Sequence, residues 1–326
     1  MPTLRLLIAG VFLLATVNQT FAEDLPVHRP VVEGEWWRIA SNPDLGKWTS
    51  EKQEPVDFGI WQAADGAWQL WSCIRHTLHP GRTRLFYSWE GRRLSDTDWC
   101  PTGIRFTGDG TIGETVGGMQ APFVIRVDDD YRMYYGDYRH ICLATSKDGK
   151  SFQKQLSNGM AGLFGEGPRA HARDPMLIRI GPRWYCYYSA HPDGRHGVWL
   201  RTSSDLKNFS NPRRVMTGGQ AGNQWWNFEC PHVVRLGGWF YLFHTQSYTP
   251  GKQQTSVYRS ADPTWFGIDD DSNFVCHLPI AAPELVEHEG QWYIAALSKN
   301  LDGIRIARLN WKKEPSTDQT STVNHD

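Results

Sequence analysis

Three short peptides place carboxylate side chains at the starts of separate aromatic-rich segments. They are Val56-Asp57-Phe58, Arg173-Asp174-Pro175 and Glu229-Cys230-Pro231. Two carboxylates can divide the work of breaking an acetal bond, because one attacks the carbon or activates water while the other protonates the leaving oxygen. The sequence therefore predicts a carboxylate-based site, provided that the fold brings Asp57, Asp174 and Glu229 together.

The chain is built from repeated units that could achieve this. Three serine-containing turns begin 57 residues apart, at Ser146, Ser203 and Ser260. An offset series of prolines, each followed by an apolar strand pattern, recurs at intervals of 53, 56 and 52 residues, at Pro122, Pro175, Pro231 and Pro283. Regular spacing of this kind indicates structural repeats.

Each proline is followed by a turn and an aromatic strand pattern. These aromatic patterns span residues 131–135, 184–188, 239–243 and 292–296, and residues 56–71 supply an earlier unit. Short alternating segments between polar turns are typical of strands rather than helices. Five such units predict an all-β, five-bladed β-propeller, because radial closure hides the sheet edges. The first strand of each blade would line the central channel, so residues beside the prolines should converge on one funnel.

The predicted propeller occupies residues 51–312. Residues 1–22 have the pattern of a signal peptide, with a basic start, an apolar run too short to cross a bilayer and a small residue at the end. Residues 23–50 form a lead-in segment, and residues 313–326, rich in Ser, Thr and charge, are expected to be a disordered tail. No later apolar run is long enough for a membrane span, so we expect a secreted or periplasmic protein.

Composition limits the classes of partner. The 326 residues include 34 Lys and Arg against 35 Asp and Glu, so the net charge of -1 gives no global field for nucleic acid or anionic membranes. The 16 Trp and 12 Tyr suit both core packing and stacking on sugar rings. We expect an oligosaccharide or polysaccharide partner, and the oligomeric state stays open.

The cysteines give little sign of cross-links or metal. Six cysteines would permit disulfides in an oxidising compartment, but Cys73, Cys142 and Cys186 lie inside strand patterns where buried thiols are common. We therefore expect no more than one disulfide. No spacing resembles a zinc site, and the acidic runs 128–130 and 269–271 fit solvated turns better than metal ligands, so neither a metal nor a cofactor is predicted.

The set of an early Asp, a distant Arg-Asp-Pro and a nearby Glu-Cys-Pro resembles the furanosidase propeller superfamily of invertases, levanases and levansucrases, with arabinanases as relatives. The last two motifs look specifically like glycoside hydrolase family 32, and the resemblance covers about residues 50–312. It implies Asp57 as nucleophile or base, Asp174 as transition-state stabiliser and Glu229 as acid/base. The function it implies is an exported glycoside hydrolase that cleaves fructofuranoside- or arabinofuranoside-like bonds.

The segment around Asp57 departs from the family pattern. Family 32 usually carries Asn-Asp-Pro-Asn-Gly at this place, whereas residues 56–61 read VDFGIW. Family 32 and the arabinanase-like family 43 both stay open, as does the retaining or inverting outcome. Arabinanase-like propellers sometimes hold a structural calcium in the channel, which no Asp-rich loop here indicates. The alternative function is a catalytically silent carbohydrate-binding propeller that kept the funnel and its aromatic residues.

Five further residues beside the predicted funnel are expected to bind substrate: Trp61, Gln120, Arg173, Trp226 and Glu284. Arg173 should contact substrate hydroxyls or orient Asp174. Glu284 could equally belong to a structural hydrogen-bond network. Asp65 competes with Asp57 for the catalytic role, but its Asp-Gly pattern between two strands predicts an exposed hairpin turn.

Overall fold

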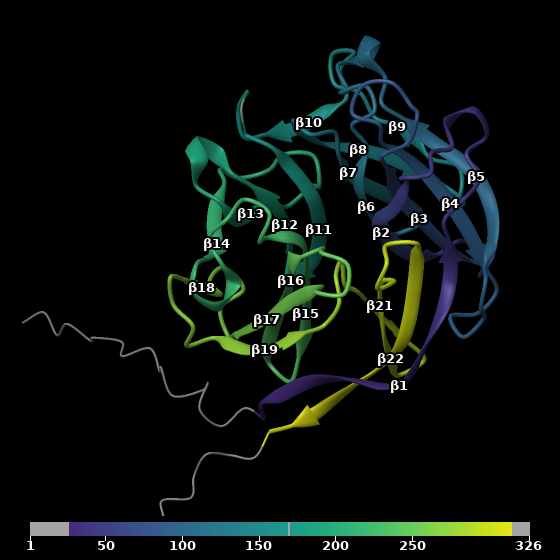
Figure 1. Cartoon of the computed structure of the whole chain (residues 1–326). Coiled ribbons are helices and arrows are strands. Elements are labelled where there is room, and N and C mark those ends of the chain that lie inside the picture. The colour runs from purple at the N-terminus through teal and green to yellow at the C-terminus, as the bar shows by residue number, and fades with distance from the viewer. Residues whose placement is uncertain (1–25, 169, 315–326) are drawn as a thin grey trace, which may run out of the picture.

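The computed structural model describes residues 26–168 and 170–314, which form five β-sheets arranged in a ring (Figure 1). The predicted all-β five-bladed propeller is confirmed. The helical segments in this part of the chain are short 3-10 turns, at Gly46–Trp48, Gly110–Ile112, Pro192–Gly194 and Gly219–Ala221. The predicted signal peptide, and the predicted tail from residue 315 onward, lie outside the described residues.

Apart from β18, the strands of the first four blades come from consecutive stretches of the chain. Blade one contains β2 (Glu54–Gln62), β3 (Trp68–Arg75), β4 (Leu85–Gly91) and β5 (Cys100–Thr107). Blade two contains β6 (Gln120–Val127), β7 (Asp130–Gly136), β8 (His140–Ser146), β9 (Gln153–Lys154) and β10 (Gly162–Gly165). Blade three contains β11 (Ala172–Ile180), β12 (Arg183–Ala190), β13 (Gly197–Ser203) and β14 (Arg213–Thr217), with β18 (Gly267–Ile268) added in parallel. Blade four contains β15 (Glu229–Leu236), β16 (Trp239–Ser247), β17 (Gln254–Ser260) and β19 (Phe274–Leu278).

Blade five joins the two ends of the described chain. It contains β20 (Glu284–His288), β21 (Gln291–Leu297) and β22 (Gly303–Lys313), and its outer strand is β1 (His28–Ser41). β1 runs antiparallel to β22, from the pair His28 and Lys313 to the pair Ser41 and Gly303. The residues of β1 belong to the segment that the sequence analysis treats as a lead-in. Their partner strand, β22, lies at the other end of the described chain, so the local repeat spacing does not predict this pairing.

The inner strands and aromatic strands lie where the sequence predicts them. Three of the four prolines fall inside β6, β11 and β15, and Pro283 directly precedes β20. The inner strands contact one another around the ring, β2 with β6, β6 with β11, β11 with β15, β15 with β20 and β20 with β2. Aromatic side chains of the second and third strands pack between blades; Phe86 of β4 and Tyr135 of β7, for example, meet edge to face with ring centroids 5.9 Å apart. Fully burying such a side chain stabilises the fold by about 1.5–3 kcal/mol.

Each inner strand has a residue with positive φ at the same place. These residues, called the bulge positions below, are Asp57 (φ 41°), Ala121 (38°), Asp174 (57°), Cys230 (48°) and Ala282 (50°). In blades one to four the ladder to the second strand shifts register at this point, as a β-bulge does. Left-handed backbone is strained for residues other than glycine, and its recurrence at one place in every blade fixes how these side chains leave the strand.

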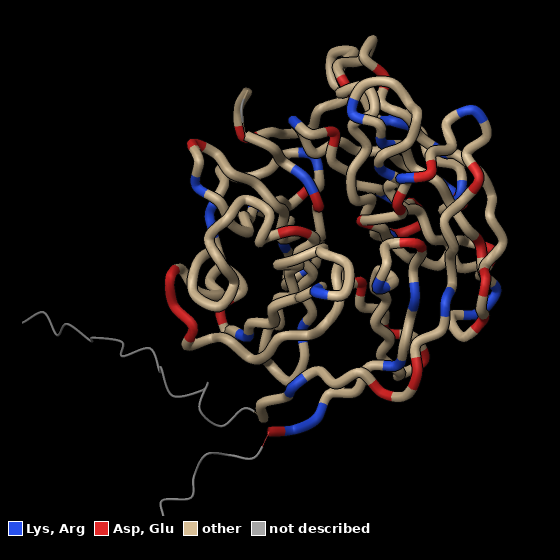
Figure 2. The backbone as a smooth tube through the Cα atoms, viewed as in Figure 1, with Lys and Arg blue, Asp and Glu red and all other residues tan. Residues whose placement is uncertain are grey.

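Charged residues of both signs are spread along the chain, and its cysteines are unpaired in the described structure. Lys and Arg are interspersed with Asp and Glu over the described chain (Figure 2). All six cysteines lie in the described residues and are free. Within residues 26–168 and 170–314, no helix has the length and apolar character needed to cross a membrane.

Candidate active site

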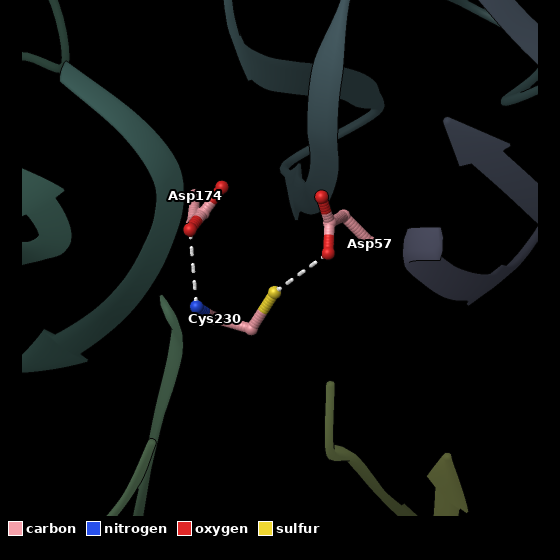
Figure 3. Close-up of side chains that lie close together, drawn as sticks. All are labelled: Asp57, Asp174 and Cys230. Atoms are coloured by element: carbon pink, nitrogen blue, oxygen red, sulfur yellow. Dashed lines mark hydrogen bonds between the residues drawn. The ribbon is translucent and has the colours of Figure 1, made fainter. Parts of the chain in front are cut away.

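The bulge positions of three blades form the centre of the site. Asp57 and Asp174 occupy them in blades one and three, and Cys230 does so in blade four with Glu229 directly before it. Figure 3 shows Asp57, Asp174 and Cys230 pointing toward one another. One carboxylate oxygen of each Asp and the sulfur of Cys230 all lie within 4.8 Å of one another. The repeat architecture thus brings the three peptides together from separate blades.

A cavity of about 700 Å³, called the funnel cavity below, opens above this centre. A volume of this size is typical of small-molecule sites. Its charged and aromatic lining consists of Asp57, Arg75, Arg82, Arg84, Tyr138, His171, Arg173, Trp225, Trp226, Glu229 and Tyr248. Amide side chains add Gln120, Asn227, Gln246 and Gln254. The mixture of acids, amides and aromatic rings suits a polyhydroxylated ligand with apolar C-H faces.

Asp57 is held by two donors on one oxygen. It is 6% exposed, and its Oδ1 accepts hydrogen bonds from Tyr248 Oη at 2.7 Å and from Cys230 Sγ at 3.4 Å. Its Oδ2 has no hydrogen-bond partner among the described residues, so that oxygen is available to a ligand in the cavity. An oriented carboxylate with one free oxygen meets the needs of a nucleophile or a general base.

Asp174 lies deeper and is 3% exposed. Its Oδ2 accepts a hydrogen bond from Cys230 N–H at 3.1 Å and lies 3.6 Å from Arg173 Nε. Its Oδ1 is buried without a hydrogen-bond partner in the described structure. Burial raises the pKa of Asp174, and the nearby charges of Asp57 and Glu229 add to this rise, while Arg173 opposes it.

Arg173 connects Asp174 with Glu229. Its guanidinium donates from Nη2 to Glu229 Oε1 at 2.8 Å and, at 3.3 Å, to the carbonyl of Trp225, whose ring it also faces. Burial alone would lower the pKa of Arg173, but Glu229 and Asp174 outweigh it and raise the pKa. The pair fixes Glu229 at the cavity wall with its Oε2 free of partners in the described residues. Arg173 Nη1 is buried and unpartnered as well.

Residues 117–325 match the sequence profile described as "Glycosyl hydrolases family 32 N-terminal domain", which is more than half of the chain. The chain belongs to this family. Among curated relatives, the sucrose-6-phosphate hydrolase of Escherichia coli is 34% identical over 104 residues, which cover 31% of this chain and 20% of the relative. The probable sucrose-6-phosphate hydrolase of Psychromonas ingrahamii is 23% identical over 174 residues, which cover 52% of this chain and 30% of the relative. The chain therefore aligns with less than a third of either relative.

Solved structures agree on the fold. An exo-1,5-α-L-arabinanase from a bovine ruminal metagenomic library aligns with a TM-score of 0.58 at 18% identity, covering 80% of this chain and 93% of that one. A family 32 β-fructofuranosidase of Bombyx mori aligns with a TM-score of 0.56 at 18% identity, covering 87% of this chain and 62% of that one. At such identities the likeness establishes the propeller fold and no more.

The structure places the predicted substrate-binding residues of this family 32 chain in two groups. Gln120, Arg173 and Trp226 line the funnel cavity, and Gln120 Oε1 is buried there without a partner in the described residues. Trp61 is 6% exposed and lies between blades one and two, where its Nε1 donates to the carbonyl of Gly149 at 2.7 Å. Glu284 lines a small void of about 10 Å³ in the central channel rather than the funnel cavity.

Glu284 and Trp61 are drawn away from the cavity by local partners. Glu284 lies 3.4 Å from His232 Nδ1, and burial raises the pKa of its carboxyl. Trp61 packs edge-on against Phe152. The competitor Asp65 forms an ion pair with Lys150 at 2.6 Å in the turn after β2, where it is exposed, as the sequence analysis predicts.

Four contributors to the site carry no sequence signal of their own. Tyr248 follows β16 in a connection between strands, and Arg82, Arg84 and Tyr138 also lie between strands. Their side chains reach the cavity because the loops at this end of the blades fold over the funnel, which repeat spacing does not specify. Cys230 belongs to a quoted motif, and its bulge position identifies it as the blade-four counterpart of the two aspartates.

The cluster of Asp57, Asp174 and Cys230 has distances that would also suit a metal ion. Its ligand atoms are already engaged, since Asp57 Oδ1 accepts from Tyr248 and Asp174 Oδ2 accepts from the Cys230 amide. Burial raises the pKa of the Cys230 thiol, so the sulfur is not a thiolate, and Arg173 places a positive charge beside Asp174. These contacts fit a hydrogen-bonded carboxylate cluster better than a metal centre.

Proposed function

We propose that this family 32 protein is a glycoside hydrolase that cleaves furanosidic bonds in oligosaccharides or polysaccharides. The observation that supports this best is that Asp57 and Glu229 line one cavity, with an oxygen of Asp174 within 4.8 Å of one of Asp57. Cleavage of a furanoside passes through an oxocarbenium-like transition state, which needs a carboxylate at the ring and a proton donor at the leaving oxygen.

Asp57 acts as nucleophile or base through Oδ2, because Tyr248 and Cys230 occupy Oδ1. Glu229 protonates the leaving oxygen through Oε2, because Arg173 occupies Oε1. Each carboxylate is thereby oriented before substrate arrives, which lowers the entropic cost of reaching the reactive geometry.

Asp174 stabilises the transition state from below. Its free Oδ1 and the free Nη1 of Arg173 are buried polar atoms that a sugar hydroxyl could satisfy. A carboxyl group at this place also lies near the positive charge that develops on the sugar ring, which favours its ionised form as the reaction proceeds. The proposed reaction uses side chains and water alone and requires no cofactor.

The sugar is fructose or arabinose in furanose form in this proposal, in keeping with family membership and with the names of its relatives. Action in the periplasm or outside the cell is part of the proposal because residues 1–22 have the pattern of a signal peptide. N-terminal sequencing of the mature protein from the native cell tests that part, and an intact Met1 would overturn it.

The activity itself is tested by product analysis over a panel of fructosides, arabinofuranosides and galactofuranosides. We expect turnover of at least one furanoside by the wild-type protein and none by Asp57→Asn. Exposed Arg92, which lies outside the cavity, provides a matched control as Arg92→Gln. Failure of every substrate, combined with binding of the same sugars, would replace the hydrolase with a carbohydrate-binding propeller.

A further inference from the structure

Two arginines that line the funnel cavity form no ion pair with any described residue. Arg82 and Arg84 lie in the connection between β3 and β4, and both line the cavity. The other two arginines of the cavity are paired, Arg75 with Glu54 at 2.7 Å and Arg173 with Glu229 at 2.8 Å. No hydrogen bond or ion pair joins the guanidinium of Arg82 or of Arg84 to any described residue.

Tyr138 contacts both of these cations through its ring. The guanidinium carbons of Arg82 and Arg84 each lie 5.0 Å from the centroid of its ring. Cation–π contact compensates part of the repulsion between them, but it neutralises neither charge. Burial raises the pKa of Tyr138, so its phenol stays uncharged, and burial lowers the pKa of neighbouring His171. Of the acids that line the cavity, Asp57 and Glu229 help to raise the pKa of Arg84, but neither forms an ion pair with it.

The backbone presents the two arginines rigidly. Arg82 N–H donates to the carbonyl of Val116, and Arg84 N–H donates to that of Gly117, each at 2.9 Å. Gly117 packs so tightly that a Cβ there would collide with the carbonyl of Pro80. Because hydrogen bonds hold this loop against residues 116–117, its backbone needs little further ordering when a ligand binds.

Tyr138, which contacts both arginines, has a strained backbone conformation. Its φ of 76° is left-handed, which a tyrosine rarely adopts. The preceding Asp137 stabilises the turn, since its Oδ1 accepts hydrogen bonds from the amides of Arg139 at 2.9 Å and His140 at 2.7 Å. Strain maintained in this way is typical of functional positions.

We propose that Arg82 and Arg84, stacked on Tyr138, form a subsite for an anionic substituent of the sugar substrate: a phosphate, a sulfate or a carboxylate. Two guanidinium groups supply several donors in forked arrangements that match these oxyanions, and the negative charge relieves their mutual repulsion. The subsite shares the cavity with Asp57 and Glu229, so a charged group here would select substrates for the proposed hydrolysis, on which this inference rests. Both arginines precede residues 117–325, so the subsite lies outside the segment matched to family 32.

Binding can be tested without turnover. Calorimetry on the Asp57→Asn protein would use inorganic phosphate, inorganic sulfate and glucuronate as probes of the three chemistries. We expect at least one probe to bind with a Kd near or below about 1 mM. Its affinity should fall about 10- to 100-fold in the triple variant that combines Asp57→Asn with Arg82→Gln and Arg84→Gln. Arg92→Gln in the same background should leave binding unchanged. No binding of any probe, or equal binding after loss of both arginines, would overturn the subsite.

A turnover assay provides the second test of the subsite. Among the uncharged, 6-phosphorylated and 6-sulfated forms of one furanoside, a charged form should have the highest kcat/KM. The double variant Arg82→Gln and Arg84→Gln should reduce the ratio of kcat/KM for the charged form to that for the uncharged form about 10-fold or more. Arg84→Lys, which keeps the charge but loses the fork, should reduce it less. An unchanged preference contradicts the subsite, whereas absence of turnover with intact anion binding contradicts the proposed hydrolase alone. Circular dichroism of each variant confirms that it is folded.

Discussion

Replacing Glu229 with Gln would separate its chemical role from its structural one. The Gln side chain has the same size and keeps an oxygen that can accept the 2.8 Å hydrogen bond from Arg173, but it cannot act as an acid. For a furanoside with a poor leaving group, such as an alkyl or sugar aglycone, kcat should fall by about 10²- to 10⁴-fold. A nitrophenyl furanoside leaves without protonation, so its kcat should stay within about 10-fold of the wild-type value.

The structural cost of Glu229→Gln can be worked out from its contacts. The hydrogen bond from buried Arg173 changes from a charged to a neutral acceptor, which costs about 1 kcal/mol, or about 2–4 °C in Tm. Glu229→Ala removes the acceptor, leaving Arg173, which is 3% exposed, with the Trp225 carbonyl at 3.3 Å and Asp174 at 3.6 Å. Breaking a buried pair in this way should cost about 3 kcal/mol.

Initial rates on the two classes of leaving group, together with differential scanning fluorimetry, test both halves of this reasoning. Asp57→Asn is the comparison, because loss of the nucleophile or base should reduce turnover of both substrates alike. An equal loss on both substrates for Glu229→Gln would mean that Glu229 is not the acid. A Tm for Glu229→Ala equal to that for Glu229→Gln would mean that the hydrogen bond from Arg173, which Gln retains, contributes nothing to stability.

Two further predictions concern the groups around the carboxylates. Tyr248→Phe removes the donor at 2.7 Å from Asp57 Oδ1, so kcat should fall about 10- to 100-fold with a smaller change in KM, and steady-state kinetics showing an unchanged kcat would contradict a positioning role. The pKa of Asp174 is raised by burial, so its carboxyl stabilises the folded state below its usual pKa, and that contribution is lost as the pH rises toward 7. The Tm of Asp174→Asn minus that of the wild type should therefore increase between about pH 4 and pH 7.5. A Tm difference that is independent of pH would show that Asp174 titrates normally.

The blade architecture could be predicted because local sequence patterns specify it. Alternating aromatic segments, turn residues and prolines each act over a few residues, and their regular recurrence specifies the ring. The grouping of Asp57, Asp174 and Glu229 followed from the same periodicity, since equivalent places in a propeller converge on its axis and Glu229 directly precedes the bulge position Cys230. The outer strand β1 could not be found in this way, because its pairing with β22 depends on closure of the whole ring.

The loops over the funnel show the limit of such reasoning. Arg82, Arg84, Tyr138 and Tyr248 reach the cavity through backbone paths that differ from blade to blade. Trp61 and Glu284 lie near predicted site positions in sequence, yet the partners Gly149 and His232 turn them toward the blade interface and the channel. A step of a few residues from a bulge position is enough to change the environment of a side chain completely.

The asymmetry of the site arises from residue types placed on a symmetric backbone. All five bulge positions share the left-handed conformation, but two carry Asp, one carries Cys and two carry Ala. The alanines at residues 121 and 282 have no side chain long enough to reach the centre, so the groups of the central cluster come from blades one, three and four. Repeated backbone geometry thus provides five equivalent places around the central channel, and the difference between a short apolar and an acidic side chain at those places determines where a sugar could be held and where its bond could break.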